Sequence, residues 1–227
     1  MHLIRYTFRA KGEGHLEKRD AITQAMEKHY TSVFERYGAT SRGVDWGPDD
    51  QCQLRYSKML EVIPPSERVK EKHFELLDVG CGFGGLMQHA VGQGLVLDYT
   101  GIDVSGVLVD KGRSLFPQSQ WLVGDALKLS EDKKYDYVVC NGILTQKLQA
   151  THLEMNDYAH ALILKLFALS KKGVAFNVMS TLVNFQVDNL YYRSPVEMLS
   201  FCLGEVTRKV RLDHSYPLYE YTVFLFR

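Results

Sequence analysis

The sequence predicts an α/β fold in which helices cover a central, mostly parallel β-sheet. Two patterns predict this class: short apolar runs that have the length of buried strands, and turns that join these runs to segments with helical spacing. The length agrees, because 227 residues suffice for one such domain with an appendage. A hydrophobic content of 45% and a charged content of 24% are typical of a soluble globular protein.

The first strand-turn-helix unit contains a glycine-rich turn. Residues 74–79 form an apolar run, broken by Glu75, that is typical of a buried strand. Gly80 and Gly82 follow, and they lack a Cβ atom where the backbone and a ligand must nearly touch. A helix is expected next, with apolar residues at helical spacing: Leu86, Met87, Ala90 and Val91. The unit therefore predicts a nucleotide-binding loop.

The glycine spacing satisfies two templates. Gly80, Gly82 and Gly85 fit the G-x-G-x-x-G fingerprint of dinucleotide-binding folds. With Asp78 in front, the first two glycines and Gly84 also fit acidic-x-G-x-G-x-G, which is motif I of class I S-adenosylmethionine-dependent methyltransferases. Neither match alone decides between an NAD-dependent oxidoreductase and a methyltransferase.

The following units favour the methyltransferase template. Residues 99–103 predict a short strand that ends in Asp103, where both templates place a carboxylate for the ribose hydroxyls. Residues 121–126 form an apolar strand that ends in Gly-Asp-Ala, and residues 135–142 resemble the motif IV strand. The order and spacing of these motifs resemble the class I methyltransferases, whereas a dehydrogenase has no comparable requirement for an acid at Asp125.

The resemblance covers residues 74–180. It implies a three-layer, Rossmann-like, seven-stranded and mostly parallel sheet with an antiparallel C-terminal strand, and it implies the cofactor S-adenosyl-L-methionine. The positions that match the cofactor site of the family are Asp78, Gly80, Cys81, Gly82, Asp103, Val104, Asp125, Ala126, Asn141 and Arg55.

Some of these positions have specific roles in the family. The acid that Asp125 matches bonds the adenine amino group, and the residue that Ala126 matches supplies a backbone donor. Asn141 falls beside the donor methyl group and the acceptor. Arg55 matches an arginine that binds the methionyl carboxylate in many relatives, although a solvated surface arginine is an equal alternative. Cys81 is expected to be a packed thiol rather than a nucleophile.

Residues 1–73 are expected to form a helical N-terminal cap or lid, and residues 74–227 the cofactor-binding domain. One helix should end near Gly38, and a second should stop at Pro64. The apolar face of the first helix consists of Ile22, Met26, Tyr30, Val33 and Tyr37. These helices either cap the sheet or also cover a bound substrate with three aromatic side chains: Tyr30, Tyr37 and Trp46.

The C-terminal third completes the same plan. A helix over residues 156–170 should stop at Lys171-Lys172-Gly173, before a fifth strand over 174–179. A helix should start at Pro195, and two closing strands are expected over 205–213 and 219–226. The candidate acceptor residues here are Tyr191 and Arg193, which could equally cover an edge of the core. His152 is the candidate general base.

Composition narrows the class of partner. Lys+Arg and Asp+Glu both number 27, so the chain carries no electrostatic footprint for nucleic acid or an anionic membrane, and neither partner is expected. Four scattered cysteines without a C-x-x-C pair fit a reducing compartment and favour neither a metal site nor disulfides. Without a signal-peptide core or an apolar run of about 18 residues, a cytoplasmic location is expected.

The expected function is methyl transfer to oxygen or nitrogen of a small-molecule acceptor, by a monomer or homodimer. The alternatives are an RNA or protein methyltransferase, a non-catalytic cofactor-binding relative and, more distantly, an NAD-dependent oxidoreductase. Residues 140–143 are Cys-Asn-Gly-Ile, so the N-P-P-[YF] motif of base and glutamine-amide methylation is absent.

Overall fold

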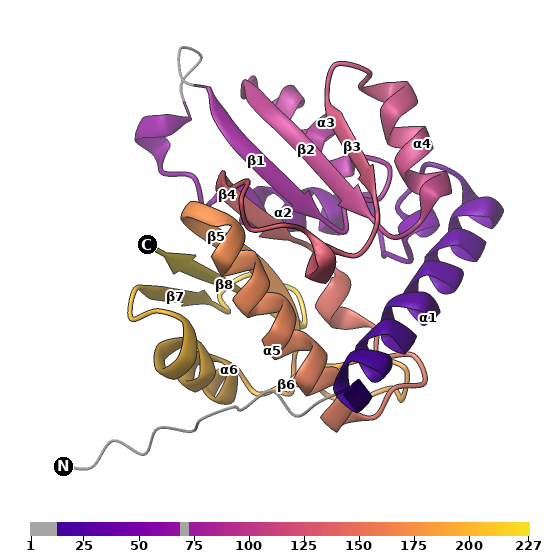
Figure 1. The fold of residues 1–227 in the computed structure, drawn as a ribbon, viewed down its shortest axis with the longest axis vertical. Helices are drawn as coiled ribbons and strands as arrows, with labels where there is room; N and C mark the ends of the chain where they lie inside the picture. Colours follow the sequence, from indigo (N-terminus) through magenta and orange to yellow (C-terminus); the bar gives the residue numbers. More distant parts are fainter. Residues whose placement is uncertain (1–12, 69–72) are drawn as a thin grey trace.

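The computed structural model describes residues 13–68 and 73–227 of the chain. Within these residues, seven strands follow one another across a single sheet in the order β3-β2-β1-β4-β5-β8-β7 (Figure 1). Five run parallel: β1 (Phe74–Val79), β2 (Leu97–Asp103), β3 (Gln120–Val123), β4 (Tyr135–Cys140) and β5 (Ser170–Ser180). Only β8 (Glu220–Phe226) runs the other way: it is antiparallel to both of its neighbours, β5 and β7 (Val210–Asp213), and the two-residue β6 (Tyr192–Arg193) pairs with β5. The predicted seven-stranded sheet with an antiparallel end is confirmed.

Helices cover both faces of the sheet and make it the middle of three layers. In the described part of the chain the α-helices are α1 (Glu13–Tyr37), α2 (Asp49–Leu60), α3 (Gly85–Gly92), α4 (Gly106–Leu115), α5 (His152–Leu169) and α6 (Pro195–Phe201). Leu76 of β1 belongs to one core cluster with Met59 of α2 and Leu86 of α3, whereas Leu77 belongs to the other cluster with Leu162 of α5. Burial on both faces explains why these strands are apolar at consecutive positions.

The N-terminal helix α1 crosses the carboxyl edge of the sheet. Figure 1 shows it running from α5 to α4, and contacts at both ends fix it there. Arg19 forms an ion pair with Asp157 of α5 at 2.8 Å, and the hydroxyls of Thr31 and Ser105 lie 2.7 Å apart at the start of α4. The helix therefore covers the edge at which parallel sheets bind ligands.

The helix α2 belongs to a sheet-covering layer, because Met59 and Leu60 are fully buried in the same core as β1 and β4. Residues 1–12 and 69–72 of the predicted N-terminal segment lie outside the described residues. No helix of the described chain is both long and apolar enough to cross a membrane.

Several predicted boundaries and faces were wrong. The apolar face of α1 continues in steps of four to Phe34, which is 8% exposed, while Tyr37 is 41% exposed. Val91 was expected on the buried face of α3 but is 50% exposed. Helix α5 starts at His152, four residues early, because Thr151 and Glu154 form a capping box.

The C-terminal boundaries also differ from the prediction. Lys171 and Lys172 lie within β5 rather than at a helix stop, because Ser170 and Gly173 on either side of them already pair with β4. Their ammonium groups form ion pairs with Glu75 and Glu67. The first closing strand starts only at Val210, since a π-helical turn, Cys202–Val206, extends the preceding helix.

Candidate active site

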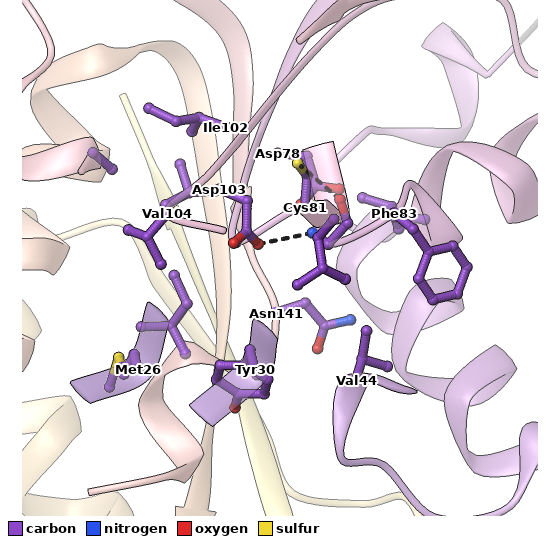
Figure 2. A pocket seen from close by; sticks show the side chains of 18 of the residues that line it. Met26, Tyr30, Val44, Asp78, Cys81, Phe83, Ile102, Asp103, Val104 and Asn141 are labelled. Atoms are coloured by element: carbon purple, nitrogen blue, oxygen red, sulfur yellow. Dashed lines mark hydrogen bonds between the residues drawn. The ribbon is translucent and has the colours of Figure 1, made fainter. Parts of the chain in front are cut away.

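A cavity lies at the carboxyl ends of β1, β2 and β4, bordered by α1, α2 and the loop between them (Figure 2). The space free of protein atoms, open mouth included, is about 930 Å³. The helix after β1, α3, covers one face of the sheet, and the helix after β4, α5, covers the other face. The gap between two such neighbouring strands is a topological switch point, where ligands of α/β proteins bind. Nine of the ten residues predicted to bind the cofactor line this cavity: Asp78, Gly80, Cys81, Gly82, Asp103, Val104, Asp125, Ala126 and Asn141.

The glycine-rich loop brings bare backbone to the cavity. Gly80 and Gly82 have φ values of +75° and +54°, a region that favours glycine. A Cβ atom at position 80 would lie 2.7 Å from the side chain of Ile143. The N–H groups of Gly80 and Cys81 both donate to the carbonyl oxygen of Ile102, at 2.8 and 3.2 Å. The loop is thus held against the end of β2.

Asp103 is fixed by backbone donors. Its Oδ2 accepts from the N–H of Gly82 and its Oδ1 from the N–H of Ser105, both at 2.9 Å, and Figure 2 shows the carboxylate turned toward the glycine-rich loop. Burial raises the pKa of Asp103, and the backbone hydrogen bonds oppose this shift. Each carboxylate oxygen retains acceptor capacity for a ligand hydroxyl.

Asp78 is a second buried carboxyl group, 2% exposed, at the end of β1. The hydroxyl of Tyr99 donates to its Oδ2 at 2.7 Å. Burial raises the pKa of Asp78 to about 7, the Tyr99 hydrogen bond lowers it, and the nearby Asp103 carboxylate raises it further. The carboxyl group of Asp78 therefore binds or releases its proton near neutral pH.

Asp125 closes the far side of the cavity after β3. Its Oδ1 accepts from the N–H of Leu127 at 2.9 Å and caps the 3₁₀ turn Ala126–Lys128. Its Oδ2 accepts from the hydroxyl of Thr23 at 3.3 Å. Since Thr23 belongs to α1, this contact ties the covering helix to the third strand.

Asn141 is an unsatisfied amide in the cavity wall. The residue follows β4 and is 7% exposed. Neither its Nδ2 nor its Oδ1 has a hydrogen-bond partner among the residues that the structure describes, although both atoms are buried. Buried polar groups are almost always paired, so a free donor and a free acceptor here point to a ligand.

Four aromatic side chains form another part of the wall: Tyr30, Trp46, Tyr56 and Phe83. Trp46 packs against Tyr56 with ring centroids 5.5 Å apart, and it lies 3.0 Å from where a Cβ atom at position 142 would be. Burial raises the pKa of Tyr30 and of Tyr56, so both hydroxyls stay protonated. The wall is apolar with two hydroxyl groups.

The charges of the cavity are all acidic. Among the described lining residues, the groups that can carry a charge in the usual pH range are the carboxyl groups of Asp78, Asp103 and Asp125, and there is no Lys, Arg or His. Cys81 is 5% exposed and burial raises its pKa well above the usual value, as expected of a packed thiol. Within residues 13–68 and 73–227, no group of three or more His, Cys, Asp or Glu side chains could hold a metal ion.

Comparisons with known proteins identify the family. Residues 76–162 match the model of a methyltransferase domain. A Mycobacterium tuberculosis (strain H37Rv) protein named "Putative methyltransferase Rv1506c" is 30% identical over 154 residues, which are 67% of this chain and 92% of that protein. This chain is a class I S-adenosylmethionine-dependent methyltransferase. Its cofactor is S-adenosyl-L-methionine, and the oxidoreductase alternative is removed.

Solved structures share the fold of this methyltransferase. The magnesium protoporphyrin IX methyltransferase (ChlM) of Synechocystis PCC 6803 with bound SAH has a TM-score of 0.61 at 14% identity, over 92% of this chain and 99% of that one. The plantazolicin methyltransferase BpumL has a TM-score of 0.58 at 12% identity, over 94% of this chain and 98% of that one. At these identities the likeness concerns the fold.

Two residues predicted to contact ligands from the N-terminal segment lie outside the cavity lining of the methyltransferase. Arg55 donates from Nε to Oε2 of Glu220 at 2.9 Å, and its guanidinium carbon lies 5.3 Å from the Trp46 ring centroid. Tyr37 is exposed beside Arg36. Their predicted roles in binding cofactor and substrate therefore rest on the sequence alone.

Three residues predicted from the C-terminal part also lie elsewhere. His152 is exposed at the start of α5, with its ring centroid 6.3 Å from that of Tyr191. Tyr191 is fully buried and donates to Asn156 at 2.7 Å, so it covers the core. Arg193 pairs with Glu197 at 3.3 Å. None of the three predicted residues lines the cavity, and their predicted catalytic or binding roles remain predictions.

Sequence reasoning missed several lining residues: Thr23, Met26, Val44, Tyr56, Phe83 and Ile143. Met26 belonged to the predicted apolar face of α1, and Phe83 stands inside motif I, so the sequence did contain a signal that these two residues lie near the cavity. Thr23 and Tyr56 had none, because their placement depends on how α1 and α2 dock on the sheet.

Proposed function

We propose that this methyltransferase methylates an oxygen or nitrogen atom of a small, largely apolar molecule bound beside the cofactor. The aromatic wall formed by Tyr30, Trp46, Tyr56 and Phe83 carries this proposal. Flat apolar side chains suit a compact acceptor with a ring or a conjugated system. No cationic side chain occurs among the described lining residues, which favours a neutral acceptor over an anionic one.

The cavity suits the cofactor at three places. The fixed Asp103 carboxylate can accept hydrogen bonds from both hydroxyls of a ribose, because its two oxygens have about four lone-pair sites and are held in place by backbone N–H groups. Gly80 and Gly82 leave no side chain between the loop and an extended ligand. Asn141 offers a donor and an acceptor that no described residue occupies.

The adenine end is assigned to Asp125 and Ala126, at the start of the 3₁₀ turn after β3. Asp125 would accept from the exocyclic amino group, and the backbone N–H of Ala126 would donate to the ring. The Thr23 hydroxyl holds the Asp125 carboxylate at 3.3 Å, so α1 closes this end against water.

The residues of the chain mainly have to position the acceptor. When bound, the cofactor supplies an electrophilic methyl group on a sulfonium sulfur. Trp46 and Tyr56 restrict the orientation of a planar acceptor, and the protonated hydroxyls of Tyr30 and Tyr56 are available to donate to it. Alignment and exclusion of water account for much of the rate of an in-line displacement. An amine or an acidic hydroxyl then needs no general base.

Two proteins of the same fold support a small acceptor. One is named for magnesium protoporphyrin IX and the other for plantazolicin, and the latter was solved with a desmethyl analogue. The predicted lack of a nucleic-acid partner rests on the balanced charge of the chain, and a monomer or homodimer remains the predicted assembly.

Transfer of label from methyl-labelled S-adenosylmethionine tests the proposal. Three acceptor pools are compared: aromatic and heteroaromatic small molecules, total RNA, and a dialysed protein extract. Label is expected in the first pool only, and labelled RNA or protein would overturn the proposal. Trp46→Ala should reduce transfer at least about tenfold. The matched control Tyr37→Ala, outside the cavity lining, should behave as the wild type.

A further inference from the structure

A continuous chain of buried hydrogen bonds runs from α2 to the residue beside Asn141. Arg55 Nε donates to Glu220 Oε2 at 2.9 Å, and Asn177 Nδ2 donates to Glu220 Oε1 at 2.9 Å. Asn177 Oδ1 accepts from the backbone N–H of Gly142 at 2.8 Å. Four elements of the chain, far apart in sequence, are therefore joined at the carboxyl edge of the sheet: α2, β8, β5 and the turn after β4.

This chain is withdrawn from solvent. Glu220 and Asn177 are each 1% exposed, and the Arg55 side chain is 15% exposed. Each oxygen of Glu220 and each amide atom of Asn177 has a partner within the protein, and neither residue lines the cavity. Their side chains thus bind other parts of the protein rather than the cofactor or acceptor.

The arrangement is poorly explained as a stabilising ion pair. Arg55 uses only Nε toward Glu220, and its Nη1 is buried without a partner among the described residues. A buried charge pair loses solvation that a single hydrogen bond recovers only in part, and apolar replacements are often no less stable. A buried donor left unpaired adds to that loss. Such a pair is more readily understood as a means of holding one geometry.

The geometry that it holds is the turn at Gly142. This residue has φ of +92°, a conformation that favours glycine, and Asn177 anchors its N–H. Trp46 packs directly on the turn, 3.0 Å from a Cβ position there, and also lies under the Arg55 guanidinium. The preceding residue is Asn141, whose amide reaches the cavity with both polar atoms unpaired. Any shift of the turn moves that amide.

We propose that Arg55, Glu220 and Asn177 form a positioning relay that holds the amide of Asn141 in the cavity and couples it to the docking of α2 and Trp46. The three are positioning residues, since they act through Gly142 rather than on the reacting atoms. The inference rests on the proposed function in one respect, namely that Asn141 contacts the bound cofactor.

Calorimetric titration with S-adenosylhomocysteine tests the relay through a double-mutant cycle. Asn141→Ala removes the amide, and Asn177→Ala breaks the anchor of Gly142. A charge-balanced pair, Arg55→Met with Glu220→Leu, breaks the far end without leaving a buried lone charge. Thr222→Val is the matched control, because Thr222 lies on β8 opposite Asn177 and its buried 2.8 Å hydrogen bond to Tyr216 is lost, but it takes part in none of the hydrogen bonds of the relay.

Each relay variant should weaken binding about fivefold in the wild-type background and less than about 1.5-fold when Asn141 is already alanine. Thr222→Val should bind as the wild type does. A relay that merely supports the fold would weaken binding by the same factor in both backgrounds, and that result would overturn the inference. If Asn177→Ala does not fold, the charge-balanced pair provides the same cycle.

Failure of the relay is distinguishable from failure of the proposed function. If Asn141→Ala binds as tightly as the wild type, the relay has no target and the inference is overturned, while label transfer to small molecules can still succeed. If small molecules receive no label but the cycle is non-additive, the relay stands and the acceptor assignment fails. Loss of hydrogen-exchange protection at the Gly142 amide in the relay variants is the accompanying spectroscopic signature.

Discussion

The carboxylate of Asp103 accepts a hydrogen bond from the backbone N–H of Gly82 at 2.9 Å, and this contact joins the end of β2 to the glycine-rich loop. The residue that is assigned to the ribose therefore also holds the loop that is assigned to the rest of the cofactor. A fixed carboxylate needs no reorganisation when a ligand arrives, which favours binding. The same contact holds the glycine-rich loop and the end of β2 together at one cavity.

The buried carboxyl group of Asp78 should make stability depend on pH. Its pKa is raised from 3.8 to about 7, so the folded state keeps a proton that the unfolded state releases between these values. The free energy of unfolding should therefore fall as the pH rises from about 4 to about 7. Asp78→Asn keeps the shape but carries no charge, so it should lack this fall.

Urea denaturation of both proteins across this pH range provides the measurement. The stability difference in favour of Asp78→Asn should grow by about 3 kcal/mol between pH 4 and pH 7, and stay constant above pH 8. Parallel profiles for the two proteins would contradict the assignment of a neutral, buried Asp78.

Two helical glycines should respond in opposite ways to alanine. A Cβ atom on Gly112 of α4 would lie 2.3 Å from the Trp121 ring, whereas nothing lies within 4 Å of a Cβ atom on Gly92 of α3. Gly112→Ala should destabilise by about 1–3 kcal/mol through overpacking. Gly92→Ala should stabilise by up to about 1 kcal/mol, because alanine is the better helix former.

Chemical denaturation reports both changes as shifts of the urea midpoint at constant slope. Gly92→Ala is the matched control, since both residues are helical glycines. Equal effects of the two substitutions would show that Trp121 does not pack on Gly112 as described.

Asp45 should hold the loop that carries Trp46. Its Oδ2 lies 2.8 Å from Nε2 of His29 and accepts from Nε2 of Gln146 at 2.9 Å, although its φ of 58° is unfavourable for most residues. Asp45→Ala removes both contacts and retains the unfavourable φ. Asp45→Asn tolerates this conformation and can still accept from Gln146.

Limited proteolysis measures how often this loop opens. The rate of cleavage between residues 38 and 48 should rise at least about fivefold in Asp45→Ala, the equivalent of about 1 kcal/mol, and less in Asp45→Asn. Unchanged cleavage in Asp45→Ala would mean that other contacts hold the loop.

Residues of the cofactor side were predictable because their placement follows from local sequence. Asp103 and Asp125 each end or follow a strand, and parallel strands bring their carboxyl ends to one edge. The glycines of motif I could be predicted because their role depends only on their own backbone conformation. Nine of the ten positions therefore reached the cavity without knowledge of the packing.

Arg55, the tenth position predicted for the cofactor, and the residues predicted for the acceptor were less predictable because long-range packing decides their placement. Arg55 donates a hydrogen bond to Glu220, which lies 165 residues away in the sequence, and no local sequence pattern predicts that contact. Tyr191 turns into the core toward Asn156, which is one of the two placements that the sequence left open. On α1, the difference between Phe34 and Tyr37 is a matter of helical register against α4 and the glycine-rich loop. Side-chain identity alone did not distinguish these outcomes.

The most direct measurement is calorimetric titration of the wild type, Asp103→Asn and Asp110→Asn with S-adenosylhomocysteine. Asp110 is the control, since its side chain is 71% exposed on α4 beside Arg113. Wild type and Asp110→Asn should bind with equal, micromolar affinity, and Asp103→Asn should bind at least about tenfold more weakly. Equal binding by all three proteins would contradict the placement of the cofactor in this cavity.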